Sequence, residues 1–157
     1  MKVSKKKVLK MMLCILVFFI LINICWYAWR MEKYEVYNQG MEENAFSTWI
    51  VPRYAYTDVN GYDYSVKYPN YLSFTGNLCV GLPTKDDYAF SDCLIIWPRL
   101  FGGYDYGVIL SKGDESFSIY INADGSAVYP EDSEVVARNQ EGIDDLLSRA
   151  KEMWNLE

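Results

Sequence analysis

Residues 11–29 form a continuous apolar segment without a charged side chain, and Asn23 is its one clearly polar member. In a helix, which rises about 1.5 Å per residue, this segment covers roughly 28 Å, close to the hydrocarbon core of a bilayer at about 30 Å. A single span must satisfy its own backbone polar groups, and a helix does so. A helix that is apolar on every side has no face for water. The segment therefore predicts a transmembrane helix.

A cleaved secretory signal peptide is the main alternative, because it also has a basic start and an apolar middle. The apolar segment here is longer than the roughly 7–15 residues usual in such peptides, and a cleavage site needs small residues. The segment ends in Ile24-Cys25-Trp26-Tyr27-Ala28-Trp29, in which only Ala28 is small. A lipoprotein signal is also disfavoured, because such a signal has a small residue before its cysteine, whereas Ile24 precedes Cys25 here. These features favour an uncleaved anchor.

The charges around the segment predict its orientation. Five lysines precede it, whereas Arg30 and Lys33 alternate with Glu32 and Glu35 after it. The positive-inside rule places the N-terminus in the cytoplasm and the rest of the chain outside the cell membrane. We therefore predict a basic cytoplasmic tail (1–10), a single transmembrane helix (11–29), a juxtamembrane helix or stalk (30–52) and an extracytoplasmic domain (53–157).

The part of the chain after the segment is strongly acidic. Residues 31–157 contain 9 basic and 21 acidic residues, a net charge of −12, which the whole-chain charge of −6 conceals. Such a charge argues against binding nucleic acid and against lying flat on an anionic lipid surface. The negative charge leads us to expect no nucleic acid as a partner. The apolar segment leads us to expect the lipid bilayer as the partner of the anchor.

Several segments of the acidic part have the pattern of antiparallel strands. Tyr54–Tyr68 is centred on Asn60-Gly61, which suits a type I′ hairpin turn. Tyr71–Phe74 and Leu78–Leu82 are a second candidate pair, and Asp92–Trp97 is an apolar run that ends at Pro98. The clearest pattern is Ser116–Ile121, where apolar and polar residues alternate. Together with Tyr104–Leu110 and Ser126–Tyr129, these segments predict a β-meander.

The C-terminus has the pattern of an amphipathic helix that begins near Glu141. Its apolar residues recur at helical spacing, acids crowd its first turn as the helix dipole favours, and Asn139 is a candidate N-cap. The apolar residues are Ile143, Leu146, Leu147, Ala150, Met153 and Trp154. The predicted fold class is α+β, with a mostly antiparallel meander packed against this helix.

Four cysteines occur in the chain, two of them in the apolar segment. Cys79 and Cys93 lie outside it, at equal distances from Asp86 in a candidate hairpin that would place them opposite each other. A disulfide is one interpretation, and it would add about 3 kcal/mol by closing a loop of about 15 residues. A pair of buried thiols is the other interpretation.

Few kinds of catalytic or metal site fit this composition. The chain has no histidine, which removes Ser-His-Asp and Cys-His catalysis and the commonest metal ligand. Two outer cysteines are too few for a cysteine-only zinc site, and no phosphate-binding glycine loop or dinucleotide fingerprint is present. The acidic pair Asp86-Asp87 belongs to a scatter of carboxylates without a catalytic pattern. We predict no cofactor, no metal and no catalytic residue.

The segment from Trp97 to Tyr106 is the most unusual part of the outer domain. It contains Gly102-Gly103, a flexible turn, between aromatic residues. Exposed aromatic rings stack on sugars or bind the apolar side chains of a partner, and Arg and Tyr are frequent in binding hot spots. Rings that complete the core are the alternative interpretation. The candidate binding residues are Trp97, Arg99, Phe101, Tyr104 and Tyr106.

These features favour a non-enzymatic membrane-anchored protein whose outer domain binds another envelope protein or a cell-wall glycan. A second hypothesis is a structural subunit that assembles through its N-terminal helix, as pilin-like proteins do. Those proteins typically have a glycine before the processing site and a glutamate early in the helix, and neither residue precedes Trp29 here. A third hypothesis is a hydrolase that uses paired carboxylates.

Overall fold

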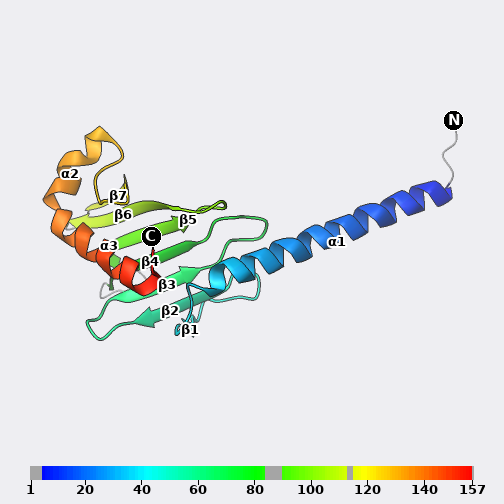
Figure 1. The fold of residues 1–157 in the computed structure, drawn as a ribbon, viewed down its shortest axis with the longest axis horizontal. Helices are drawn as coiled ribbons and strands as arrows, with labels where there is room; N and C mark the ends of the chain where they lie inside the picture. Colours follow the sequence, from blue (N-terminus) through cyan, green and yellow to red (C-terminus); the bar gives the residue numbers. More distant parts are fainter. Residues whose placement is uncertain (1–4, 84–89, 113–114, 157) are drawn as a thin grey trace. The chain divides into compact units, whose positions relative to one another are not determined.

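The computed structural model describes residues 5–83, 90–112 and 115–156 (Figure 1). The Asp86-Asp87 pair lies outside these residues. The chain divides into two compact units, one up to Glu35 and one from Val36 onward. We call the second unit the head and describe each unit separately.

The first unit is one helix, α1 (Lys5–Glu35), of 31 residues. It is long and apolar enough to cross a membrane and has no amphipathic face, as the sequence predicts. Near the end of its apolar part the guanidinium of Arg30 lies 4.6 Å from the ring centre of Trp26 and 5.0 Å from that of Tyr27. The helix ends at Glu35, so the segment predicted as a helix or stalk (30–52) is part of this helix only as far as that residue.

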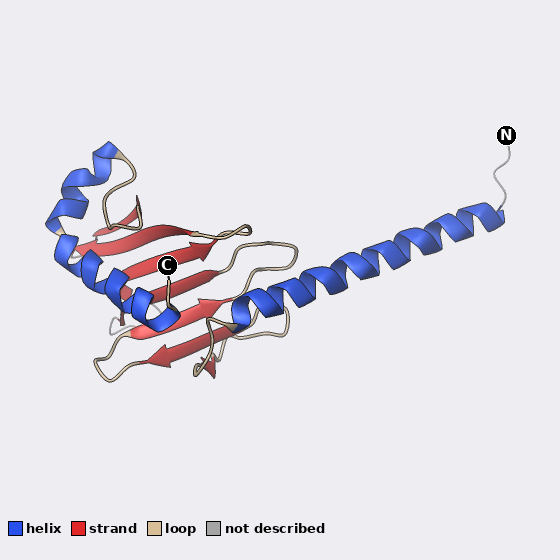
Figure 2. Cartoon of the chain, in the orientation of Figure 1, coloured by secondary structure: helices blue, strands red, loops and turns tan. Residues whose placement is uncertain are grey.

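The described part of the head contains one antiparallel sheet of seven strands, drawn in red in Figure 2, and its strand order follows chain order (Figure 1). Each strand therefore pairs with the next strand along the chain, which makes the sheet a meander. The strands are β1 (Glu42–Glu43), β2 (Arg53–Thr57), β3 (Asp63–Lys67), β4 (Asn77–Pro83), β5 (Phe90–Pro98), β6 (Tyr104–Lys112) and β7 (Glu115–Ile121).

Three predicted details of the meander are wrong. Ser126–Tyr129 is not a strand, because its pairing is an isolated bridge between Ala127 and Ile121. The turn between β2 and β3 is not type I′, because Gly61 has a positive φ of 84° and Asn60 does not. Instead the Asp58 carboxylate accepts the backbone N–H groups of Asn60 and Tyr62, at 2.8 and 2.9 Å. Residues 71–74 form a loop rather than a strand, and β4 pairs with β3.

The last part of the chain is helical. A short 3₁₀ turn, η1 (Pro130–Asp132), leads into α2 (Ser133–Arg138) and then α3 (Gln140–Trp154). The stripe predicted for the C-terminal helix is buried, except that Met153 is half-buried. Asn139 precedes α3 but does not cap it, because its side-chain amide donates backwards to the carbonyl of Val135 at 2.8 Å.

The sheet has two unlike faces. On one face, which we call the core face, α3 packs across the strands (Figure 1), and Trp154 meets the ring of Tyr64 edge-on at 5.9 Å. The fully buried residues of this face include Val66, Leu78, Val80, Leu94 and Ile96. The other face, which we call the pocket face, carries Ile95, Trp97, Gly107 and Tyr120. The head is thus a meander covered by a C-terminal helix, and the prediction of an α+β fold is confirmed.

Cys79 and Cys93 are free buried thiols that are not within disulfide distance. The register explains the wrong prediction: Cys79 lies opposite Ile95 and Cys93 opposite Gly81, so the cysteines are diagonal neighbours on the pocket face. Diagonal neighbours are commonly about 7–8 Å apart, and their Cβ atoms only somewhat less, whereas the two Cβ atoms of a disulfide are roughly 3.5–4.5 Å apart. The Cys93 thiol contacts the Cys79 thiol, and this contact together with burial raises the pKa of Cys93.

Candidate functional site

The β5–β6 hairpin positions all five predicted binding residues. Trp97 lies near the end of β5, Arg99 and Phe101 lie in the loop, and Tyr104 and Tyr106 begin β6. Trp97 lies opposite Asp105, and Gly107 lies opposite Tyr120, so all four belong to the pocket face.

A glycine makes room for the Trp97 ring. A Cβ atom at Gly107 would lie 2.9 Å from two atoms of that ring and 3.3 Å from the carbonyl oxygen of Ile119, so a larger residue would displace the indole. With glycine at this position, the indole lies across β6 and reaches Tyr120 on β7, at 5.8 Å between ring centres. Tyr120 in turn meets Tyr129 edge-on at 6.5 Å. Three aromatic rings therefore follow one another across the pocket face.

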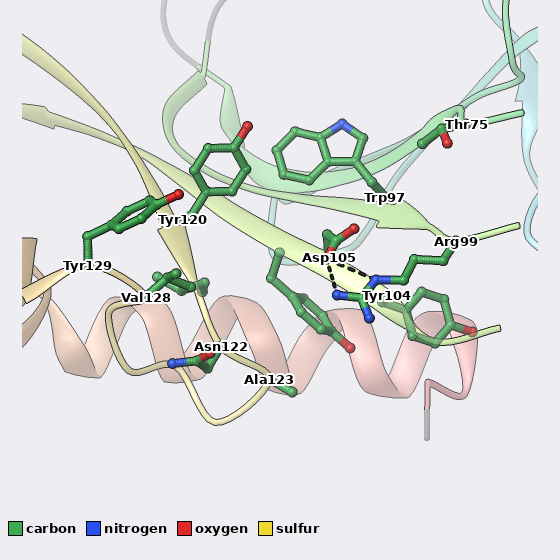
Figure 3. A pocket seen from close by; sticks show the side chains of 12 residues that line it. Thr75, Trp97, Arg99, Tyr104, Asp105, Tyr120, Asn122, Ala123, Val128 and Tyr129 are labelled. Atoms are coloured by element: carbon green, nitrogen blue, oxygen red, sulfur yellow. Dashed lines mark hydrogen bonds and ion pairs between the residues drawn. The ribbon is translucent and has the colours of Figure 1, made fainter. Parts of the chain in front are cut away.

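These rings border a cavity of about 740 Å³ (Figure 3), which we call the aromatic pocket. Its walls come from β5, β6, β7 and the segment after β7, where Val128 donates its backbone N–H to the carbonyl of Tyr120 at 3.0 Å. The pocket is lined by Thr75, Trp97, Arg99, Tyr104, Asp105, Tyr106, Tyr120, Ile121, Asn122, Ala123, Val128 and Tyr129.

One ion pair supplies the charge of the aromatic pocket. The Arg99 guanidinium donates to the Asp105 carboxylate through both Nε, at 3.0 Å, and Nη2 (Figure 3). The hydrogen bond between the two side chains lowers the pKa of Asp105 and raises the pKa of Arg99. The Arg99 side chain is 59% exposed and the Asp105 side chain 49%, and both residues line the pocket.

The structure brings four of the five predicted residues together in this pocket and adds several that the sequence analysis missed. Tyr120, Asn122, Val128 and Tyr129 come from β7 and the segment after it. The sequence contained a signal for Tyr120, because it lies on the polar side of the alternating strand. In the structure its side chain is 54% exposed. Phe101 does not line the pocket, since it lies at the tip of the hairpin loop and is 97% exposed.

A second polar cluster joins α3 to the β2–β3 turn. Arg149 donates to Asp145 at 2.8 Å and to Asp58 at 3.4 Å, and its guanidinium lies 3.6 Å from the ring centre of Tyr62. Tyr62 donates its hydroxyl to Asp145 at 2.9 Å. Because every charged member has an opposite partner within the cluster, its geometry holds the helix against the turn.

Among the described residues, no group of three or more His, Cys, Asp and Glu side chains could hold a metal ion. No protein family, curated protein or solved structure matches this chain.

Proposed function

We propose that this chain is a single-pass protein of the cell membrane, with its N-terminus in the cytoplasm and its head outside. The length and apolarity of α1, the lysines before it and the aromatic residues at its outer end support this topology. The anchor is uncleaved in this proposal, so the head works at the membrane surface.

We propose further that the head is a non-enzymatic binding domain and that the aromatic pocket takes a cell-wall glycan. The row of Trp97, Tyr120 and Tyr129 carries this proposal. The π face of an aromatic ring is electron-rich and attracts the polarised C–H groups on one side of a sugar ring. Arg99, Asp105 and Asn122 add donors and acceptors for hydroxyl groups, and few polar groups among apolar walls are typical of ligand sites.

The make-up of the pocket favours binding over hydrolysis. Among the described lining residues Asp105 is the one carboxylate, and glycoside hydrolysis by the usual mechanism needs two. Asp105 is also held ionised by Arg99, whereas a general acid needs a raised pKa.

Binding can be tested with the full chain in detergent micelles and oligosaccharides of N-acetylglucosamine as probes. We expect these probes to change the tryptophan fluorescence and to bind about ten- to a hundredfold more weakly to the Trp97→Ala and Tyr120→Ala variants, because each loses a stacking ring. The Trp49→Ala variant removes an exposed tryptophan outside the pocket and is the matched control. Equal affinity in all variants, or capture of a protein by the pocket residues alone, contradicts the glycan proposal.

The anchor is tested separately, by alkaline carbonate extraction and by protease treatment of intact cells. We expect the chain to stay with the membrane and the head to be digested from outside, while a tag before Lys5 is protected. Release by carbonate contradicts the anchor and leaves the glycan measurement unaffected.

A further inference from the structure

Three loops leave the same end of the sheet. Because neighbouring strands are antiparallel and follow chain order, the β1–β2, β3–β4 and β5–β6 connections all lie at one end (Figure 2). These connections are residues 44–52, 68–76 and 99–103, and we call them together the apolar end. The β2–β3 turn, residues 58–62, lies at the opposite end.

Each loop of the apolar end holds an apolar side chain in water. Trp49 is 83% exposed, Leu72 46% and Phe101 97%. Single exposed apolar residues are common on protein surfaces, whereas one on each of three loops at the same end of the sheet makes that end a candidate interaction surface. The exposure has a structural basis in all three loops, because their own hydrogen bonds fix the backbone.

In the first loop Val51 donates its N–H to the Thr48 hydroxyl at 3.0 Å, which closes a turn around Trp49. In the second loop Leu72 has a φ of 56°, a conformation that a leucine rarely adopts. In the third loop Arg99 donates its N–H to the carbonyl of Gly103 at 3.0 Å, and Phe101 lies at the tip. These turns present the three side chains outward.

The apolar end also lacks negative charge. Its three loops contain no Asp or Glu and one basic residue, Arg99, although residues 31–157 carry a net charge of −12. Asp58 lies in the turn at the opposite end. Asp124 follows β7, but its turn is held against α3, where Lys151 donates to the carbonyl of Ala123 at 3.5 Å. The three loops themselves are thus free of acids, although Glu43 directly precedes the first loop and Asp105 pairs with Arg99 of the third.

Two basic side chains lie next to the loops. Arg53 begins β2 and Lys67 ends β3, and the register places them directly opposite each other. Like charges in this position repel, and in the described part of the chain neither side chain forms an ion pair. A pair of cations at the rim of an apolar surface fits the phosphate groups of lipids.

We propose that the apolar end docks on the bilayer, with Trp49, Leu72 and Phe101 inserted at the level of the lipid headgroups. Aromatic and aliphatic side chains favour this depth, where apolar area is buried while polar groups stay hydrated. The inference rests on the proposed anchor, which keeps the head near the bilayer. Tethering makes the contact intramolecular, so a weak affinity suffices to maintain it.

The test uses the full chain in vesicles of phosphatidylcholine, with or without phosphatidylglycerol, and a photoreactive benzoylphenylalanine at position 49, 72, 101 or 59. Val59 is the matched control, because it is 98% exposed on the turn at the opposite end. We expect about tenfold more lipid adduct from position 101 than from position 59. Phosphatidylglycerol should raise the yield a few-fold, and less so in a variant with Arg53→Gln and Lys67→Gln.

Equal lipid labelling from positions 101 and 59, or adducts between two copies of the chain at position 101, would overturn docking on lipid. A measurement without photoreactive residues gives the same information: brominated lipids should quench the native chain more than the Trp49→Phe variant, and equal quenching contradicts the proposal. Carbonate extraction of the same vesicles reports on the anchor. A chain that resists extraction but shows no preference for position 101 keeps its anchor and loses the docking proposal.

Discussion

Ile95 and Ile96 are neighbours in β5, yet they have unlike surroundings. Ile96 points to the core face, the face that α3 covers, and is fully buried. Ile95 points to the pocket face and is half-buried. The same contrast separates Leu94 from Trp97. One face of the sheet therefore provides most of the stability, and the other, less tightly covered, has aromatic rings and polar groups that a ligand can reach.

The largest expected effect comes from this matched pair of isoleucines. The Ile96→Ala variant should lower the free energy of unfolding by about 3–4 kcal/mol, because it removes buried methyl groups and leaves a cavity. The Ile95→Ala variant should lower it by only about 1 kcal/mol, because less buried area is lost. Urea unfolding of the micelle-bound chain measures both values, and equal losses would contradict the contrast between the faces.

The next effect tests whether the pocket face is shaped by packing. The Gly107→Ala variant should lose about 1–3 kcal/mol of stability, because its new methyl group meets the Trp97 ring at 2.9 Å. The displaced ring should also change the tryptophan fluorescence and weaken glycan binding. A variant with unchanged fluorescence and affinity would show that the ring position does not depend on this glycine.

A smaller effect is expected on the outer side of α3. Gly142 is exposed, and a Cβ atom there meets nothing within 4 Å. The Gly142→Ala variant should therefore stabilise the head by about 0.5–1 kcal/mol through helix propensity. The shift of the urea midpoint measures this gain. A loss of stability would mean that the helix does not tolerate the change on this side.

The smallest effect concerns how α3 is held on the core face. The Arg149 guanidinium lowers the pKa of Asp145 from its ordinary value of 3.8. A lowered folded-state pKa contributes stability above the unfolded-state value, and this stability is lost as pH falls through the folded-state value. The Asp145→Asn variant should therefore be less stable than the natural chain by about 0.5 kcal/mol near neutral pH.

At about pH 3 the natural chain and the Asp145→Asn variant should differ less in free energy of unfolding than near neutral pH, because protonation of Asp145 below its ordinary pKa of 3.8 removes part of this stabilisation. Urea unfolding at the two pH values provides the comparison. A difference that does not change with pH would mean that the Asp145 carboxylate is not stabilised by Arg149.

The sequence predicted the elements whose side chains alternate or recur regularly, such as β7 and α3, because one face of each is buried. It did not predict β1, since Glu42 and Glu43 carry no apolar pattern. It assigned residues 71–74 to a strand because aromatic residues favour strands, but these residues form an ordered loop.

The pocket was predicted in part for a similar reason. Trp97, Arg99, Tyr104 and Tyr106 are close in sequence, so one hairpin brings them together. Tyr129 reaches the pocket only because the chain after β7 turns back along that strand, a long-range arrangement that no local pattern contains. The net charge also does not show how the acids are distributed, since the three loops of the apolar end contain none of them.

The order of the strands in the meander has a consequence for how the head is made. Each new strand finds its partner already present in the segment synthesised just before it, so the sheet can grow from β1 to β7 without waiting for distant parts of the chain. The helix that covers the core face is synthesised after all seven strands. Until α3 is complete, that face exposes its leucines and isoleucines to any apolar surface nearby, and the growing head is most vulnerable to aggregation between the synthesis of β7 and that of α3.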